Sequence, residues 1–550
     1  MKNYGLLRRL LTAMLVAVSA AVWAVPARPG NWRVLTLGDG TEVVAQLVGN
    51  EWAHCWQTAD GRCFVAVDGQ YCEVSPLAMA RKRQQRSQSC RARRREPSQQ
   101  PERIYIGERC GVTILVDFPD CRFAEGHDLA YYQRMMNEPG FTSDEGYVGS
   151  VSDYFLDQSY GQFHLKFDVV GIVTMPKNYS YYGRDSRTDP DDIDIQLGDL
   201  IVTACQSTLD SLDLSQYDWN GDGEIDQILI IYAGKGQADG GDDDTIWPQE
   251  WYLSETRYGK VLEMGGYRID TYSCTSELAS RGVAGIGAVC HEYAHCLGLP
   301  DLYDTFYGGN FGLSSWSLMD SGMYNGNGFV PAGFSAFERM SCGWLTPTPL
   351  SADTLVTDMQ PLALSPDAYI VYNDSNPQEF YLLENRQPIG WDSKLPGRGM
   401  LIFHVDYDEQ IWWENEVNTT GKNTVTGNDH QRCTIFHADN RTTNVAGDAY
   451  PSGRNDSLTA TSKPAAKWYT PDSTGSQVAN VAITAITQLP DSLMSFCFST
   501  PMQPVADGIG RVSAPSVPCA VYTLGGQYVG TSLDGLPRGV YISNRKKIIK

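Results

Sequence analysis

One stretch, His291 to Asp301, constrains this chain more than any other part of its sequence. It reads His-Glu-Tyr-Ala-His-Cys-Leu-Gly-Leu-Pro-Asp. On a helix, residues four positions apart lie on the same face, so His291 and His295 can direct their imidazoles at one metal ion. Glu292 follows the first histidine, where its carboxylate can reach a water at that ion. The stretch therefore predicts a metal-binding helix with a general base beside it.

The residues after this helix predict its end and a third ligand. Gly298 can adopt the left-handed conformation that terminates a helix, and Pro300 prevents its continuation. We expect the helix over residues 285–297, with the following turn bringing Asp301 back towards the two histidines. Two imidazoles and one carboxylate leave a fourth tetrahedral position open, which is the arrangement of a catalytic zinc site.

A second segment, Ser317 to Gly322, lies shortly after the predicted metal ligands. In a tight turn, Met319 can form an apolar floor beneath the metal, although a methionine is more often plain core packing. Tyr324 can donate its phenol to a developing oxyanion. The alternative for Tyr324 is an aromatic residue in the wall of the cleft.

A second metal site is predicted at Asp218 to Asp226, where oxygen-bearing side chains occupy alternate positions. The pattern matches the first nine positions of an EF-hand loop, with Gly223 at the sharp sixth position. Leu229 replaces the closing glutamate, so we expect a structural calcium site; the alternative is an acidic solvated turn. The predicted calcium ligands are Asp218, Asn220, Asp222, Glu224 and Asp226. For the nearby Asp239 and Asp242 to Asp244, a solvated loop is the default and a second ion site the alternative.

The N-terminus predicts export. Lys2, Arg8 and Arg9 precede an apolar run over residues 10–21, and Ala24 offers a small residue for cleavage. The run is shorter than the roughly 20 apolar residues that a membrane span needs. Residues 1–24 therefore predict a signal peptide, with an uncleaved anchor as the alternative. We expect a secreted or cell-surface protein without a stable membrane span.

Charge is distributed unevenly along the chain. The formal net charge is −22, which argues against nucleic-acid binding because a phosphate backbone would be repelled. Yet Arg81 to Arg95 holds eight Lys or Arg and no acidic residue. This tract is either a solvated linker or a processing site that ends a β-rich pro-region over residues 25–95. A pro-region with a basic end can associate with the acidic remainder by charge.

Four further features complete the organisation. Residues 96–348 mix strand and helix signals, residues 349–500 look mainly β, and residues 501–550 form a small β-rich tail, so we expect an α+β protein.

The predicted pro-region also carries Cys55, Cys63, Cys72 and Cys90. One of these thiolates can cap a zinc ion, although disulfides are the more common state in exported proteins.

The stretch from His291 to Asp301, continued by Leu302-Tyr303-Asp304, resembles the immune inhibitor A-type secreted metallopeptidases, which belong among the metzincin-like zinc proteases. Residues 316–322 resemble the Met-turn of that family. Residues 380–386 and 395–406 resemble its β-rich segment, and residues 30–75 its pro-region. The resemblance implies a zincin/metzincin-like catalytic domain followed by a β-sandwich-like domain. It also implies bound zinc, secretion as a zymogen inhibited by its own pro-region, and endopeptidase activity on proteins or peptides.

The tail has a resemblance of its own. Residues 521–526 and 536–542 resemble the C-terminal sorting tails of Bacteroidetes type IX secretion cargo, which implies the secretion machinery as a partner. The alternative is a small β-unit packed on its neighbour.

The sequence thus favours a secreted zinc-dependent endopeptidase. The alternative is a secreted or surface binding protein with a zincin fold and no significant turnover. Glu292 argues against that alternative, because a purely structural zinc site has no use for a general base.

Overall fold

The computed structural model describes residues 23–50, 53–67, 69–75, 105–143, 146–186, 193–305, 309–421 and 424–500, and four short strands of the tail. The predicted processing tract, Cys90 and almost all of the predicted signal peptide lie outside the described residues. The chain divides into two compact units between Thr500 and Pro501. In the part that is described, no helix is long and apolar enough to cross a membrane.

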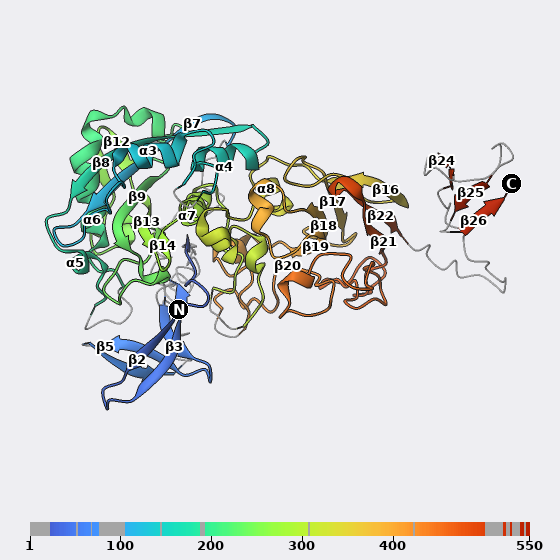
Figure 1. The fold of residues 1–550 in the computed structure, drawn as a ribbon, viewed down its shortest axis with the longest axis horizontal. Coiled ribbons are helices and arrows are strands. Elements are labelled where there is room, and N and C mark those ends of the chain that lie inside the picture. Colours follow the sequence, from blue (N-terminus) through green and yellow to red (C-terminus); the bar gives the residue numbers. More distant parts are fainter. Residues whose placement is uncertain are drawn as a thin grey trace, which may run out of the picture. The chain divides into compact units, whose positions relative to one another are not determined.

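A mixed sheet forms the centre of the predicted catalytic region, residues 96–348 (Figure 1). Its strands, in spatial order, are β1 (Trp23–Ala24), β10 (Gln249–Tyr252), β13 (Thr271–Ala279), β9 (Ile228–Lys235), β7 (Gly107–Asp117) and β8 (Phe163–Thr174), and β14 (Gly282–Val283) pairs with β13. The pairs β13–β9, β9–β7 and β7–β8 are parallel, whereas β10 runs antiparallel to β13. Strand β1 pairs antiparallel with the other side of β10.

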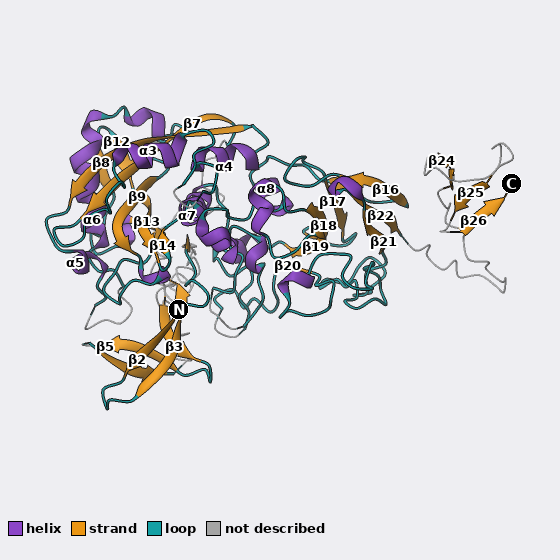
Figure 2. Ribbon diagram, viewed as in Figure 1, coloured by secondary structure: helices purple, strands orange, loops and turns teal. Residues whose placement is uncertain are grey.

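Helices bury the sheet on both faces, and Figure 2 distinguishes them from the strands they cover. Leu115 and Ile231 belong to a core shared with α3 (Leu129–Asn137), α4 (Val151–Gln158) and α7 (Gly287–Cys296). Their neighbours Ile114 and Ile230 belong to a second core shared with α5 (Tyr179–Gly183) and α6 (Leu197–Thr208). Burial on both faces explains why the sequence of these strands is a continuous apolar run.

Shorter elements connect these parts of the catalytic region. They are the hairpin β11 (Leu262–Met264) and β12 (Tyr267–Ile269), helix α8 (Ala336–Ser341), and the 3₁₀ turns η3 (Leu209–Ser211), η4 (Leu214–Tyr217), η5 (Gln237–Asp239), η6 (Leu253–Glu255), η7 (Ser314–Trp316) and η8 (Ser321–Gly328).

Two sheets pack face to face in the β-rich region. The larger has the order β15 (Thr348–Pro349), β17 (Ala368–Tyr372), β18 (Glu379–Arg386), β19 (Gly399–Asp406) and β20 (Cys433–Ile435); the smaller has the order β16 (Thr354–Met359), β22 (Met494–Ser499) and β21 (Ala482–Gln488). Tyr381 and Ile402 share a core with the smaller sheet. Their neighbours Leu382 and Phe403 belong to the core that also contains α7. The larger sheet therefore joins the catalytic region directly. Helix α9 (Glu409–Trp413) and the turns η9 (Gly390–Lys394), η10 (Val445–Gly447) and η11 (Pro490–Ser492) lie in the connections.

The predicted pro-region is an antiparallel meander of β2 (Trp32–Thr36), β3 (Glu42–Asn50), β4 (Ala53–Thr58), β5 (Cys63–Val67) and β6 (Gln70–Val74). The tail is a separate small sheet with the order β24 (Tyr528–Gly530), β23 (Val521–Thr523), β25 (Val540–Ser543) and β26 (Lys546–Ile549). The α+β prediction is confirmed.

Candidate metal centre

The two histidines of helix α7 point at the same place. Their Nε2 atoms lie 3.2 Å apart, and His291 and His295 are 0% and 4% exposed. The helix begins at Gly287, two residues later than the sequence predicts, and Gly287 packs so closely against η8 that a Cβ there would collide with the Met323 carbonyl oxygen. Gly298 has a φ of +82°, the left-handed conformation that the sequence predicts at the end of the helix.

The hydrogen bonds of the histidines fix which nitrogen faces the centre. Nδ1 of His291 donates to the Leu318 carbonyl at 2.8 Å, and Nδ1 of His295 donates to the Leu299 carbonyl at 2.9 Å. A carbonyl oxygen only accepts, so each Nδ1 carries the proton and each Nε2 presents a lone pair. Burial lowers the pKa of His295 well below the usual imidazole value, which keeps that ring neutral.

Asp301 completes a group of three ligand atoms. Its Oδ1 lies 3.3 Å from Nε2 of His291 and 3.6 Å from Nε2 of His295. Oδ1 is buried and accepts no hydrogen bond from a described residue. The three ligand atoms thus lie within 4.8 Å of one another. A metal cation satisfies such an arrangement, and two imidazoles with one carboxylate suit zinc.

Asn415 holds the third ligand in place. Its Nδ2 donates to Oδ2 of Asp301 at 2.6 Å, and its Oδ1 accepts from the Asp301 backbone N–H at 2.8 Å. Burial raises the pKa of Asp301, and the Asn415 amide opposes that rise by hydrogen bonding to the carboxylate. Sequence reasoning missed Asn415, which lies 114 residues away and follows a helix of the β-rich region.

Glu292 lies beside the histidines on the same buried helix and is 0% exposed. Its Oε1 accepts a hydrogen bond of 3.0 Å from the backbone N–H of Val25. This hydrogen bond places the Glu292 carboxylate at contact distance from a main-chain nitrogen. The contact shows that an extended chain reaches the predicted general base.

The segment predicted as a Met-turn lies under the histidines. The carbonyl of Leu318 orients His291, and the carbonyl of Met319 accepts from the Leu302 N–H at 2.8 Å. Met319 is fully buried in the core that contains α7. The predicted oxyanion donor, Tyr324, donates its phenol to the Pro26 carbonyl at 2.7 Å. Its hydroxyl therefore reaches a peptide carbonyl in this region.

Residues 25–75, the predicted pro-region, lie against the acidic stretch after η5. Arg28 forms a buried ion pair of 2.8 Å with Asp239, and Arg33 donates to the Gly241 carbonyl at 2.9 Å. Asp243 accepts from the Trp56 indole at 3.1 Å and from the Tyr71 phenol at 2.7 Å. Asp239 and Asp243 are thus contacts of residues 25–75, whereas Asp242 and Asp244 are exposed.

The cysteines near the site are not metal ligands in this structure. Cys290 is a buried thiol whose pKa is raised by burial, and Cys296 lies with its Sγ 3.6 Å from the Asp226 carbonyl oxygen. Cys72 of the pro-region is an exposed thiol outside any disulfide. Among the described residues, the only His, Cys, Asp and Glu cluster with metal-ligand spacing is His291, His295 and Asp301.

The predicted calcium loop folds as a tight turn around Asp218. The Asp218 carboxylate accepts backbone hydrogen bonds from Gly221, Asp222 and Gly223, of 2.8, 3.1 and 2.9 Å. Glu224 lies 3.4 Å from the Arg268 guanidinium. The loop therefore has an internal organisation of its own, and its five predicted ligands do not form a metal-spaced cluster.

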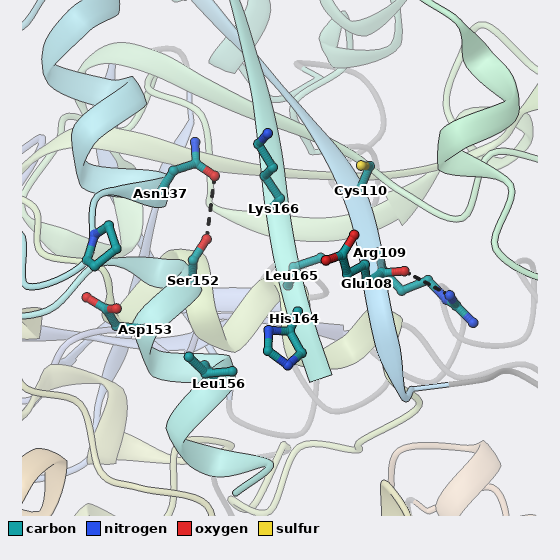
Figure 3. A pocket seen from close by; sticks show the side chains of 11 residues that line it. Glu108, Arg109, Cys110, Asn137, Ser152, Asp153, Leu156, His164, Leu165 and Lys166 are labelled. Atoms are coloured by element: carbon teal, nitrogen blue, oxygen red, sulfur yellow. Dashed lines mark hydrogen bonds between the residues drawn. The ribbon is translucent and has the colours of Figure 1, made fainter. Parts of the chain in front are cut away.

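A separate pocket of about 320 Å³ lies between β7, β8, α3 and α4. Figure 3 shows Asn137 and Ser152 on one side of it and Lys166 and Glu108 on the strands opposite. None of the predicted site residues lines it. The pocket is therefore distinct from the metal centre.

The comparisons with known proteins concern the catalytic region. Residues 112–344 match the family model of the immune inhibitor A peptidase M6 catalytic domain. The chain is 34% identical over 246 residues to Immune inhibitor A of Bacillus thuringiensis subsp. alesti, covering 40% of this chain and 35% of that protein. It is 29% identical over 266 residues to Pre-pro-metalloprotease PrtV of Vibrio cholerae serotype O1, covering 42% of this chain and 29% of that protein.

The chain thus spans about a third of the length of these curated relatives. The matched range contains His291, Glu292, His295 and Asp301, and it ends before Asn415. The comparisons support a metallopeptidase catalytic domain of the peptidase M6 type at residues 112–344.

Proposed function

We propose that this chain is a secreted zinc-dependent endopeptidase that hydrolyses peptide bonds in proteins. One observation carries the proposal: Nε2 of His291, Nε2 of His295 and Oδ1 of Asp301 converge within 4.8 Å of one another, beside the buried carboxylate of Glu292. The peptidase M6 match over the same residues supports it.

The proposed mechanism follows from the positions of the side chains. His291, His295 and Asp301 would hold the zinc ion, whose Lewis acidity polarises the attacking water and the scissile carbonyl. Glu292 takes the proton of the water on a carboxylate oxygen and passes it to the nitrogen of the leaving amine. Tyr324 stays the proposed donor to the oxyanion. Its hydrogen bond to the Pro26 carbonyl lies one residue beyond the Val25 nitrogen that Glu292 binds, so this contact holds the bound chain and does not mark the scissile carbonyl.

We further propose that residues 25–75 keep the enzyme inactive before cleavage within Arg81 to Arg95. The Val25 N–H engages Glu292, and the meander binds the acidic stretch through Arg28, Arg33, Trp56 and Tyr71. A chain held in this position denies a substrate access to the general base.

Calcium binding at residues 218–226 and export of the protein remain proposals that rest mainly on sequence patterns. The alternate oxygens of the loop support a structural calcium ion, whereas its internal hydrogen bonds suit a turn. The apolar run of residues 10–21 supports export, and the resemblance of residues 521–526 and 536–542 supports sorting by a secretion system.

A chelator experiment separates the proposed enzyme from a binding protein. Casein hydrolysis by the processed protein should stop when zinc is stripped and return when stoichiometric zinc is added, with magnesium as the control ion. If the zinc-loaded, processed protein does not cleave casein or a mixed peptide library, the endopeptidase proposal is wrong and the binding-protein alternative stands.

A further inference from the structure

The segment from Val25 to Arg28, which begins the chain once residues 1–24 are removed, reaches Glu292 with its first nitrogen. In the unprocessed chain, Trp23 and Ala24 precede it and pair antiparallel with β10, opposite Glu250 and Gln249. Beyond them, the Val25 carbonyl accepts from the Trp247 indole at 3.0 Å, and the Arg28 N–H donates to the Ala238 carbonyl at 2.9 Å. Val25, Ala27 and Arg28 are all buried.

The position of the Val25 nitrogen shows which residue of this segment corresponds to which residue of a cleaved substrate. It donates to Glu292 at 3.0 Å, and Glu292 is the group that returns a proton to the leaving amine. Val25 therefore occupies the place of the first residue after a cleaved bond. Counting from Val25, Arg28 occupies the place of the fourth residue after that bond.

The side chain of Arg28 lies in an enclosed binding site, here called its seat, which is formed by Asp239, Asn327 and Tyr324. Nη1 lies 2.8 Å from Oδ2 of Asp239, Nη2 donates to Oδ1 of Asn327 at 3.1 Å, and the guanidinium lies 5.3 Å from the centroid of the Tyr324 ring. The side chains of Arg28 and Asp239 are 9% and 12% exposed. A carboxylate, an amide oxygen and an aromatic face together recognise a guanidinium.

Every group of this seat belongs to the catalytic region. Asp239 lies in η5, where its Oδ1 also accepts from the Ser280 N–H at 3.1 Å, and Tyr324 and Asn327 lie in η8. The seat therefore stays on the enzyme when residues 25–75 leave. A partly buried carboxylate without its cation is unfavourable, which gives a substrate that supplies a cation an advantage.

We propose that Asp239, Asn327 and Tyr324 form a substrate subsite that selects a basic side chain, arginine above lysine, at the fourth residue after the cleaved bond. This inference rests on the proposed peptidase function and names its substrate class: proteins with an arginine at that position. Arginine is favoured because its planar guanidinium can contact Asp239 and Asn327 at once.

The test uses the processed enzyme and quenched fluorescent peptides that differ only at the fourth residue after one cleavable bond. The residues compared are Arg, Lys, norleucine and Glu, and mass spectrometry of the products verifies the cleaved bond. We expect kcat/KM for the Arg peptide to exceed that for the norleucine peptide at least about tenfold, with Glu lowest. Equal values for the Arg and norleucine peptides would overturn the subsite.

A variant locates the preference in the seat. In Asp239→Asn, the ratio of kcat/KM for the Arg and norleucine peptides should fall towards one. Asp242→Asn is the matched control, because the Asp242 side chain is 90% exposed and faces Arg33. An unchanged ratio in Asp239→Asn would contradict the assignment, and the peptide series on the unaltered enzyme decides the question if that variant does not fold.

The outcomes also separate the two levels of proposal. Cleavage of no peptide would contradict the peptidase function itself. Cleavage of all peptides at similar rates would keep the peptidase and reduce the seat of Arg28 to an anchor for the pro-region.

Discussion

At the scale of single residues, the metal centre depends on groups that no ligand motif contains. Asn415 makes two hydrogen bonds to Asp301, one to its carboxylate and one to its backbone. Such supporting partners fix the direction of a ligand and typically change metal affinity about 10- to 100-fold.

Replacing Asn415 should therefore weaken zinc binding. Asn415 has a φ of +53°, so Asn415→Gly removes the side chain without straining the backbone. We expect the dissociation constant for zinc, measured by competition with a chromophoric chelator, to rise about 10- to 100-fold. Asn440→Gly is the control, because Asn440 has a φ of +58° and is exposed. Equal zinc affinities in the two variants would refute a positioning role for Asn415.

The histidines predict how the metal-free protein responds to acid. Burial lowers the pKa of His295 well below its value in an unfolded chain. Below a pH of about 6.5 the unfolded chain binds this proton and the folded chain does not, so His295 should lower the free energy of unfolding as the pH falls. Asp320 opposes this change, because burial raises the pKa of its carboxyl to about 6. Urea denaturation of zinc-free protein at pH 7.5 and 5.5 measures this loss, with calcium present throughout.

The His295→Gln variant isolates the contribution of that ring. Burial also lowers the pKa of His404, so the variant should keep part of the pH dependence. The loss of stability between the two pH values should nonetheless be smaller in His295→Gln than in the parent. A loss of the same size would mean that His295 does not titrate as proposed.

At the scale of elements, the sequence predicts helices and turns better than it predicts which distant residues contact them. The i, i+4 spacing predicts α7, and the left-handed Gly298 marks its end because both signals are local. Asn415 and the pairing of Arg28 with Asp239 join residues 114 and 211 positions apart. No local pattern encodes such contacts, because the packing of the β-rich region and the pro-region on the catalytic region creates them.

The loop at residues 218–226 is an element whose role calcium can reveal. Asp218 already supports the turn through three backbone hydrogen bonds, so its loss should destabilise the protein with or without calcium. The specific expectation is that calcium raises Tm of the parent at fixed zinc, because a ligand of the folded state stabilises it. Asp218→Ala combined with Asp222→Ala should abolish that rise. If calcium does not change the Tm of the parent, the loop is a turn that binds no calcium.

At the scale of the whole molecule, buried charges join the β-rich region to the catalytic region. Arg386 of β18 donates to the carbonyls of Trp316 and Gly333 and pairs with Glu384 and Asp392. The sequence predicts both regions from their composition. It does not predict that they share one core, because the hydrogen bonds of Arg386 to Trp316 and Gly333 join positions far apart in the chain.

If residues 25–95 are a pro-region, the chain should be cleaved between them and the rest of the protein. Sequencing of the active form should give an N-terminus between Glu96 and Arg103, after the basic tract. Replacing every Lys and Arg of residues 81–95 by Gln should leave the protein uncleaved and inactive. Salt should help to release the cleaved pro-region, because it screens the exposed pair of Arg33 and Asp242, whereas the buried pair of Arg28 and Asp239 is screened much less. A fully active enzyme that still begins near Val25 would make the meander a permanent domain.

The central claim is that Glu292 performs the proton transfers of peptide hydrolysis beside a zinc ion held by His291, His295 and Asp301. The most direct measurement is the zinc content and the kcat/KM of Glu292→Ala for a peptide substrate, both compared with the parent. The account predicts unchanged zinc content and a loss of kcat/KM of several orders of magnitude, each factor of ten corresponding to about 1.36 kcal/mol of barrier. A zinc-loaded Glu292→Ala protein with near-normal turnover would contradict it.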